Sequence, residues 1–183
     1  MAIRAATIIS VEPHPDAENL LVCQVDCGDA TTAVDGSSST DAMQTRTVVA
    51  GLAGKIPINE LIGRKVLAIT NLKPAKMRGI ESTAMLLAAS NGLEDGDEIV
   101  ELLDVPAEIP NGELISLEGK DPSIPDTMLK SKGAIKAWER AKSNLKVNDA
   151  GVAIFIDESG STHRMLTSSG PVRVMTLTNA IIQ

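Results

Sequence analysis

An all-β fold, built around a five-stranded barrel of the OB type, is what the sequence predicts for residues 1–105. Two observations lead to this prediction. Short runs rich in β-branched residues alternate with segments of turn-forming residues. One short helical pattern, Ile56–Ile62, stands between the third and the fourth of these runs. Strand–strand–strand–helix–strand–strand is the element order of an OB-fold, which is a five-stranded Greek-key barrel.

The five predicted strands are apolar or β-branched over most of their length. In chain order they are Ile3–Val11, Leu20–Val25, Arg46–Gly51, Arg64–Thr70 and Ser82–Ser90. Pro57 near the start of the helical pattern and Gly63 just past its end are the limits expected of a short helix.

Two segments between these strands predict loops. Glu12–Asn19 contains Pro13 and Pro15, which block regular structure, and it also contains turn-forming residues. Asp29–Thr45 is rich in Ser, Thr, Asp and Gly and has little to bury. It therefore predicts an exposed, mobile hairpin loop inserted between the second and third strands.

Beyond the barrel, residues 106–183 predict an extension that packs on it. The elements expected after the fifth strand are short strands at Ile99–Leu103, before this boundary, and at Glu113–Leu117, a helix at Leu129–Ala141, and closing strands at Val152–Ile156, His163–Thr167 and Val172–Leu177. The helix has a partial apolar stripe, and we expect Trp138 on this stripe to anchor it on the barrel.

Composition limits the kind of ligand that the chain can bind. Trp138 and Phe155 are its only aromatic residues apart from histidine, whereas binders of unstructured single strands usually stack bases on several aromatic side chains. If the protein binds RNA, it must therefore read backbone and shape. No apolar run has the length of a membrane span and no signal peptide opens the chain, so we expect a cytoplasmic protein without a membrane partner.

The net charge of −7 is unevenly distributed along the sequence. The segment from Lys55 to Gly79 holds six cations and one acidic residue, Glu60. The segment from Leu93 to Glu118 holds nine acidic residues and no cation, and the balance turns positive again from Lys120 to Lys146. Such a distribution can focus a positive potential on one face of an acidic molecule.

The segment Asn71–Glu81 is the basic loop of the predicted barrel. It places Lys73, Lys76 and Arg78 within six residues, between the fourth and fifth strands. In an OB-fold this loop and the loop between strands one and two frame the binding face. The sequence thus indicates a phosphate-binding surface in which Arg78 can make a two-pronged contact. The alternative is an ordinary solvated loop.

Four blocks of the sequence resemble one known family. They are Arg4–Ser10 with His14-Pro15-Asp16-Ala17, Arg46–Val49 with Gly51-Leu52, Asn71–Ser90 (NLKPAKMRGIESTAMLLAAS), and Lys130–Asn148. These blocks are similar to the tRNA-binding domain of endothelial-monocyte-activating polypeptide II, of the C-terminal extension of animal tyrosyl-tRNA synthetases, and of bacterial structure-specific tRNA-binding proteins. The insertion Asp29–Thr45 and the acidic segment Glu94–Glu118 depart from the family pattern.

The resemblance implies structure-specific binding of tRNA and its delivery to an aminoacyl-tRNA synthetase, in cis or in trans. It also implies that the extension is a pseudo-dimer lobe that keeps the chain monomeric. The tRNA contacts that it implies are Asn71, Lys73, Lys76, Met77, Arg78, Ser82 and Met85, with additional contacts at Lys55, Arg64 and Lys65. For Met77 and Met85, packing at the rim of the barrel is an equal alternative.

Other chemistry finds little support in the sequence. There is no phosphate-binding glycine loop, dinucleotide fingerprint or metal-ligand motif, so we expect no cofactor, no metal and no catalysis. Cys23 and Cys27 are expected to be reduced, partly buried thiols, and His14 with Asp16 to form a packed turn rather than a general base.

The alternative function is a protein-interaction or cytokine-like signalling module of the same family. Arg4–Ser10 lies where the family carries its cytokine heptapeptide, although Ala5 and Ala6 depart from that peptide. A buried first strand accounts for the segment equally well.

Overall fold

The computed structural model describes residues 1–29, 44–92 and 98–183. Most of the predicted insertion (residues 30–43) and the start of the acidic segment (residues 93–97) lie outside the described residues. No helix in the described ranges has the length and apolar character needed to cross a membrane.

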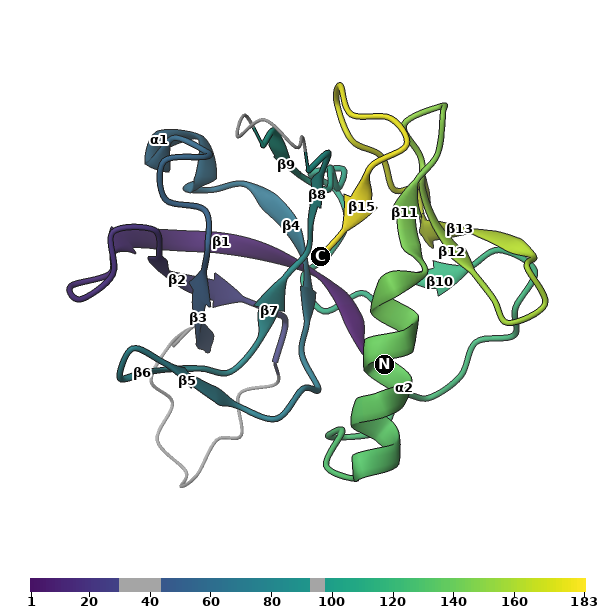
Figure 1. Cartoon of the computed structure of the whole chain (residues 1–183), viewed down its shortest axis with the longest axis horizontal. Helices are drawn as coiled ribbons and strands as arrows, with labels where there is room; N and C mark the ends of the chain where they lie inside the picture. Colours follow the sequence, from purple (N-terminus) through teal and green to yellow (C-terminus); the bar gives the residue numbers. More distant parts are fainter. Residues whose placement is uncertain (30–43, 93–97) are drawn as a thin grey trace.

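The predicted all-β barrel is confirmed. Its antiparallel sheet has the strand order β3-β2-β1-β4-β7 (Figure 1). The strands are β1 (Ile3–Pro13), β2 (Leu21–Asp26), β3 (Thr45–Ala50), β4 (Lys65–Ile69) and β7 (Met85–Leu86), and the helix α1 is Ile58–Leu61. Burial alternates along β2, as expected of a strand with one face in a core. The backbone N–H of Thr83 donates to the carbonyl of Thr47 at 2.9 Å. This bond joins β3, one edge strand of the sheet, to the segment before β7, the other edge strand.

The prediction of a single fifth strand over Ser82–Ser90 is wrong. The segment first forms β7, which pairs with β4, and then β8 (Ala88–Ser90), which leaves the barrel for a second sheet. All residues from Leu86 to Ser90 are buried. The segment therefore lacks the alternation of polar and apolar residues that would mark where β7 ends and β8 begins. Small residues such as Ala88 and Ala89 allow the chain to be covered on both sides.

The second sheet joins the barrel to the extension. Its strand order is β10-β13-β12-β11-β15-β8-β9, with β14 paired to β13. The bounds are β9 (Val100–Leu102), β10 (Ser116–Leu117), β11 (Leu145–Val147), β12 (Ala153–Ile156), β13 (Thr162–Thr167), β14 (Gly170–Pro171) and β15 (Ile181–Ile182). The helix α2 is Lys132–Ser143 and lies between this sheet and the barrel (Figure 1).

Two further expectations for the extension need correction. The helix begins at Lys132 rather than Leu129, because Ser131 caps it by accepting a hydrogen bond from the N–H of Ala134. The predicted strand Val172–Leu177 is absent. Its buried apolar residues belong to an irregular segment, in which the N–H of Val174 donates to the carbonyl of Gly151.

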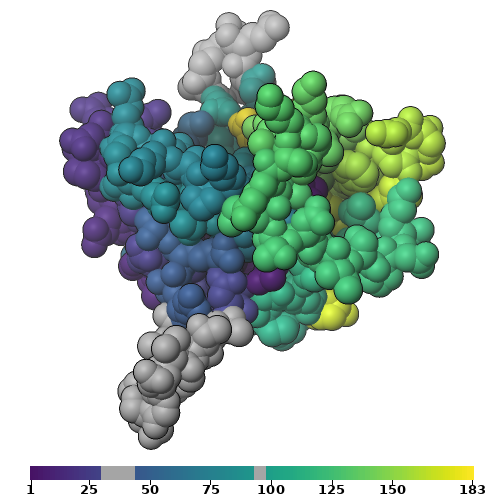
Figure 2. All heavy atoms as spheres, turned by 90° about the horizontal axis from the view of Figure 1, so that it is seen from below, coloured from purple at the N-terminus to yellow at the C-terminus, as the bar shows by residue number. Residues whose placement is uncertain are grey.

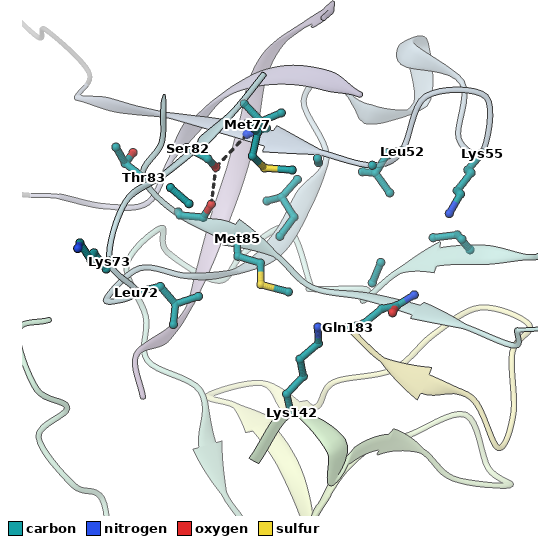
Figure 3. Close-up of a pocket in the computed structure, with 18 residues that line it drawn as sticks. Leu52, Lys55, Leu72, Lys73, Met77, Ser82, Thr83, Met85, Lys142 and Gln183 are labelled. Atoms are coloured by element: carbon teal, nitrogen blue, oxygen red, sulfur yellow. Dashed lines mark hydrogen bonds between the residues drawn. The ribbon is translucent and has the colours of Figure 1, made fainter. Parts of the chain in front are cut away.

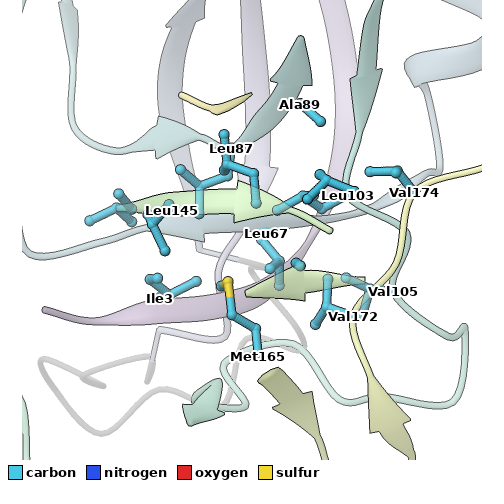
Figure 4. Packing of buried hydrophobic residues seen from close by; sticks show 14 of the residues in the cluster. Ile3, Leu67, Leu87, Ala89, Leu103, Val105, Leu145, Met165, Val172 and Val174 are labelled. Atoms are coloured by element: carbon cyan, nitrogen blue, oxygen red, sulfur yellow. The ribbon is translucent and has the colours of Figure 1, made fainter. Parts of the chain in front are cut away.

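One apolar core is shared by the barrel and the extension. Ile3, Leu67 and Leu87 from the barrel side pack in the same buried cluster as Leu145 and Met165 from the extension (Figure 4). Trp138 belongs to this cluster and is only 7% exposed, as expected of an anchor of the helix. A second cluster fills the interior of the barrel, and both predicted thiols, Cys23 and Cys27, are free and buried there.

The segment that follows β9 also closes one end of the barrel. The N–H of Gly112 donates to the carbonyl of Ala5, and the N–H of Ala5 donates to the carbonyl of Glu113. Gly28 faces this segment with a φ of 67°, and a Cβ at Gly28 would lie 2.2 Å from the carbonyl oxygen of Asn111. Only glycine fits this close approach.

Candidate nucleic-acid interface

The basic loop is itself a β-hairpin, which the sequence analysis did not predict. Strands β5 (Ala75–Met77) and β6 (Ile80–Ser82) pair with Met77 opposite Ile80, leaving Arg78 and Gly79 as a two-residue turn. Both turn residues have positive φ, 50° and 93°. This is the geometry of a type I′ turn, whose twist matches that of the flanking strands. The sequence feature that could have indicated this hairpin is Gly79, which stands between two short runs of alternating polar and apolar residues.

Arg78 occupies a position in this turn that its residue type disfavours. A left-handed conformation costs an L-residue such as arginine about 1–2 kcal/mol, and asparagine or glycine normally occupies it. Arg78 is nevertheless there, exposed, at the tip of the hairpin. Strained backbone of this kind is concentrated at functional sites, so the outlier supports a role for the guanidinium.

Lys73 and Lys76 complete the cations of the hairpin region, and both are exposed. Among the described residues, neither these lysines nor Arg78 forms an ion pair. The structure thus brings the three predicted phosphate contacts together on the hairpin and the segment that leads into it, where Glu81 lies directly opposite Lys76.

His14, in the turn after β1, supports the hairpin through hydrogen bonds of its ring nitrogens. The Nδ1 atom of this buried ring accepts a hydrogen bond from the N–H of Asp16 at 3.0 Å. Because a backbone N–H can only donate, Nε2 carries the proton and donates to the carbonyl of Met77 at 3.1 Å. The prediction of a packed turn is confirmed, and both ring nitrogens are occupied by structural hydrogen bonds.

Arg46, on β3, fixes both ends of the segment that contains the hairpin. Its Nη1 donates to the carbonyls of Thr70 at 2.8 Å and Thr83 at 3.0 Å. Its Nε and Nη2 hold the carboxylate of Asp29 at 2.5 and 2.9 Å, and this hydrogen bonding lowers the pKa of Asp29. Sequence reasoning missed this role, because its partners are carbonyls of residues far along the chain.

Two of the predicted tRNA contacts lie inside the protein. The hydroxyl of Ser82 accepts from the N–H of Val49 at 3.0 Å and donates to the carbonyl of Ala84 at 2.9 Å. The side chain of Asn71 accepts from the N–H of Ala2 and donates to the carbonyl of Asp126, both at 2.9 Å. Both residues are buried, so these hydrogen bonds fix Ser82 beside β3 and Asn71 between Ala2 and Asp126.

The three additional cations are engaged at separate places in the structure. The Nζ of Lys65 donates to the carbonyl of Ile109 at 2.5 Å and to Oδ1 of Asn111 at 2.7 Å, which ties down the segment after β9. Lys55 pairs with Glu98 at 2.5 Å, and its hydrogen bond lowers the pKa of that carboxyl. Arg64 is half-buried just after α1.

A pocket of about 570 Å³ lies between the hairpin, the barrel and α2 (Figure 3). Met77 and Met85, both half-buried, line it together with Leu72. Lys73 reaches it from the hairpin side and Lys142 from α2. The structure thus places four of the predicted contacts (Lys55, Lys73, Met77 and Met85) and the buried Ser82 around one cavity, and adds Lys142, which the sequence analysis did not assign.

The extension adds further cations on the same face of the molecule. Figure 2 shows α2 beside the segment that carries β5 and β6, with the surface between them recessed. Lys132, Lys136 and Arg140, spaced four residues apart, are exposed on α2. From α2, positive charge reaches the pocket through Lys142, and from the hairpin side through Lys73.

Comparison with known proteins connects this geometry to a family. Residues 3–114 match the family model described as "Putative tRNA binding domain". The cytoplasmic tyrosine–tRNA ligase of Xenopus laevis is 40% identical over 147 residues, which are 80% of this chain and 25% of that protein. The aminoacyl tRNA synthase complex-interacting multifunctional protein 1 of Cricetulus griseus is 34% identical over 181 residues, which are 99% of this chain and 44% of that protein.

A solved structure matches the whole fold. The crystal structure of the C-terminal domain of Plasmodium vivax p43 has a TM-score of 0.80 and 27% sequence identity, and the match covers 100% of this chain and 96% of that one. The chain spans about a quarter of the length of the tyrosine–tRNA ligases that it matches.

Proposed function

The chain belongs to the tRNA-binding domain family, and on that premise we propose that it binds folded tRNA through the β5–β6 hairpin and delivers it to an aminoacyl-tRNA synthetase. The observation that carries the proposal is the hairpin itself. Three exposed cations without ion pairs among the described residues project from an element that His14 and Arg46 hold in place. Rigidly placed cations suit phosphate groups at fixed positions on a folded RNA.

Delivery to a synthetase is supported by the kind of relative that the chain resembles. These relatives include tyrosine–tRNA and methionine–tRNA ligases and a protein named for its interaction with the synthetase complex. We propose that this chain is non-catalytic and acts in the cytoplasm, either as part of a synthetase or bound to one. We further propose that it is monomeric, since the extension covers apolar residues of the barrel such as Leu67.

The cytokine-like alternative gains no specific support. Arg4–Ser10 lies within β1 between β2 and β4, and most of its residues are buried or half-buried. Only Ile9 and Ser10 of this segment have exposed side chains, so most of the heptapeptide is held within the barrel.

Binding of unfractionated tRNA to a Lys73→Ala, Lys76→Ala, Arg78→Ala variant tests the proposal. We expect micromolar-range affinity for the unmodified protein, measured by fluorescence anisotropy between 50 and about 300 mM salt. Removal of one phosphate-binding side chain lowers the log–log salt slope by about 0.7–0.9, so the triple variant should lower it by about 2–3. Its thermal melting should be unchanged, because all three side chains are exposed.

A matched control removes three cations that lie outside the hairpin and α2 and do not line the pocket: Lys120→Ala, Arg164→Ala and Arg173→Ala. The first two form exposed ion pairs with Asp157 and Glu118, which contribute little to stability. The control has the same net charge as the test variant and should bind tRNA like the unmodified protein. Equal affinities for all three proteins would place the site elsewhere, with the cations of α2 as the next candidates.

A further inference from the structure

We infer that the pocket between the hairpin and α2 holds one unstacked nucleotide of the bound RNA, with its base against Met77 and Met85 and its flanking phosphates at Lys73 and Lys142. The inference rests on the proposed function and assigns a specific ligand group to the same face. It also gives the extension a direct part in RNA binding.

The shape of the pocket fits an occupant of this size. Its volume of about 570 Å³ lies within the range of about 300–1,000 Å³ that is usual for small-ligand sites. Figure 3 shows Met85 at the centre, Met77 of β5 above it, Leu72 beside Lys73, and Lys142 pointing in from α2. The floor is apolar and the cations stand at its edge, which is the distribution expected for a flat base between two phosphates.

The two methionines take the place of the aromatic platforms that this chain lacks. A thioether makes favourable contacts with aromatic rings at a sulfur-to-ring distance of about 5 Å, and its flexible chain adapts to different bases. Met77 and Met85 are half-buried, so part of each side chain remains available to a ligand. An apolar contact of this kind carries no sequence preference, in keeping with recognition of shape.

The charges favour a nucleotide over an acidic peptide. Lys142 lies one helical turn after the buried Trp138, so the packing of Trp138 directs Lys142 toward the pocket. Neither Lys73 nor Lys142 is ion-paired among the described residues, whereas Lys55 at the rim is neutralised by Glu98. Two cations without ion pairs among the described residues, at the edge of an apolar floor, match an anion–ring–anion pattern.

A hydrogen-bonding group is also present at the edge of the pocket. The side-chain amide of Gln183 donates from Nε2 to the hydroxyl of Ser90 at 3.0 Å. This bond fixes the amide orientation and leaves its carbonyl oxygen as an acceptor for the exocyclic amino group of a base.

The test compares folded tRNA, which has unpaired nucleotides, with a blunt-ended RNA duplex, which has none. The whole protein is labelled with ¹³C at the methionine methyl groups, and Met77→Leu and Met85→Leu variants assign the two signals. At saturating tRNA we expect upfield ring-current shifts of the Met77 and Met85 methyls, and no such shifts with the duplex. The methyl of Met175, which is 78% exposed, should move with neither RNA. Unmoved pocket methyls at saturation, or equal shifts with both RNAs, would overturn the inference.

Affinity measurements provide an independent readout. We expect Met85→Ala to weaken tRNA binding by about twofold to tenfold, and to leave duplex binding unchanged. Lys142→Gln should lower the salt slope for tRNA by about 0.7–0.9, whereas Arg173→Gln, which is not among the residues that line the pocket, should not. If both pocket variants bind tRNA like the unmodified protein, the pocket holds no nucleotide, even where the triple hairpin variant confirms the proposed function. If the triple hairpin variant keeps its affinity for tRNA, the proposed function itself is refuted.

Discussion

Replacing Arg78 by asparagine should make the protein more stable and a weaker binder of tRNA. Arg78 has a φ of 50° in a type I′ turn followed by Gly79. Asn-Gly is the favoured pair for this turn, whereas arginine there is strained by about 1 kcal/mol or more. Part of that strain is relieved in the variant, so we expect a gain of about 0.5–1 kcal/mol. For a chain of this length the gain corresponds to an increase in Tm of about 1–4 °C.

The weaker binding follows from the salt dependence of an interaction with phosphate. One phosphate contact contributes about 0.7–0.9 to the log–log salt slope, with affinity proportional to that power of the salt concentration. At 0.1 M salt, relative to 1 M, one such contact is therefore worth about a fivefold to eightfold change in affinity. We expect Arg78→Asn to weaken tRNA binding by this factor at 0.1 M salt and by much less near 1 M.

Calorimetric melting and anisotropy titrations of the same preparations measure both effects. Arg78→Ala is the matched control, because alanine removes the charge but is also disfavoured at positive φ. It should lose as much affinity as Arg78→Asn without the gain in Tm. An asparagine variant no more stable than the alanine variant would refute the argument from strain. An asparagine variant with full affinity would refute the contact between Arg78 and phosphate.

Three further outcomes are expected. Ending the chain near Val105 should expose the apolar surface that the extension covers, so the barrel alone should associate in light scattering whereas the whole chain stays monomeric; a monomeric barrel would argue against a pseudo-dimer lobe. Gly28→Ala should lower the free energy of unfolding by about 2 kcal/mol or more, since its Cβ would lie 2.2 Å from the carbonyl oxygen of Asn111, and urea titration measures the change. Burial raises the pKa of the Cys23 and Cys27 thiols from 9.0 to about 11, so the unfolded chain releases these protons first and stability should fall as the pH rises from about 9 to 11. Urea titrations at both pH values should show a smaller fall in Cys27→Ala, and an equal fall would show that the thiols do not contribute.

The sequence was sufficient to predict the order of the barrel elements, because each strand of the barrel before β7 has a turn or a glycine at its limits. It was not sufficient where one segment serves two sheets. The chain breaks between β7 and β8 because Leu86 of β7 pairs with Ala68, whereas Ser90 of β8 pairs with Ile181. No local sequence pattern indicates either partner. The strands β11 and β15 are only three and two residues long, and they form because distant residues pair with them.

For the site, the sequence identified the hairpin cations but could not separate exposed polar residues from internal ones. Asn71 and Ser82 look like surface residues of a basic loop, yet both are committed to hydrogen bonds inside the protein. Lys65 is likewise held by Ile109 and Asn111, which lie more than forty residues away. Lys142 was missed because its proximity to Met85 exists only once α2 has packed on the shared core.

The pairing of β15 with β8 has a consequence for the order in which a ribosome makes the molecule. Ser90 cannot pair with Ile181 until the ribosome has added 91 more residues. Until then the growing chain displays Leu67 and Leu87 without the residues that cover them, and such surface is prone to aggregation during synthesis. A translational pause or a premature stop between β9 and β15 would therefore leave a nascent barrel dependent on chaperones, although every residue of the β5–β6 hairpin had already been made.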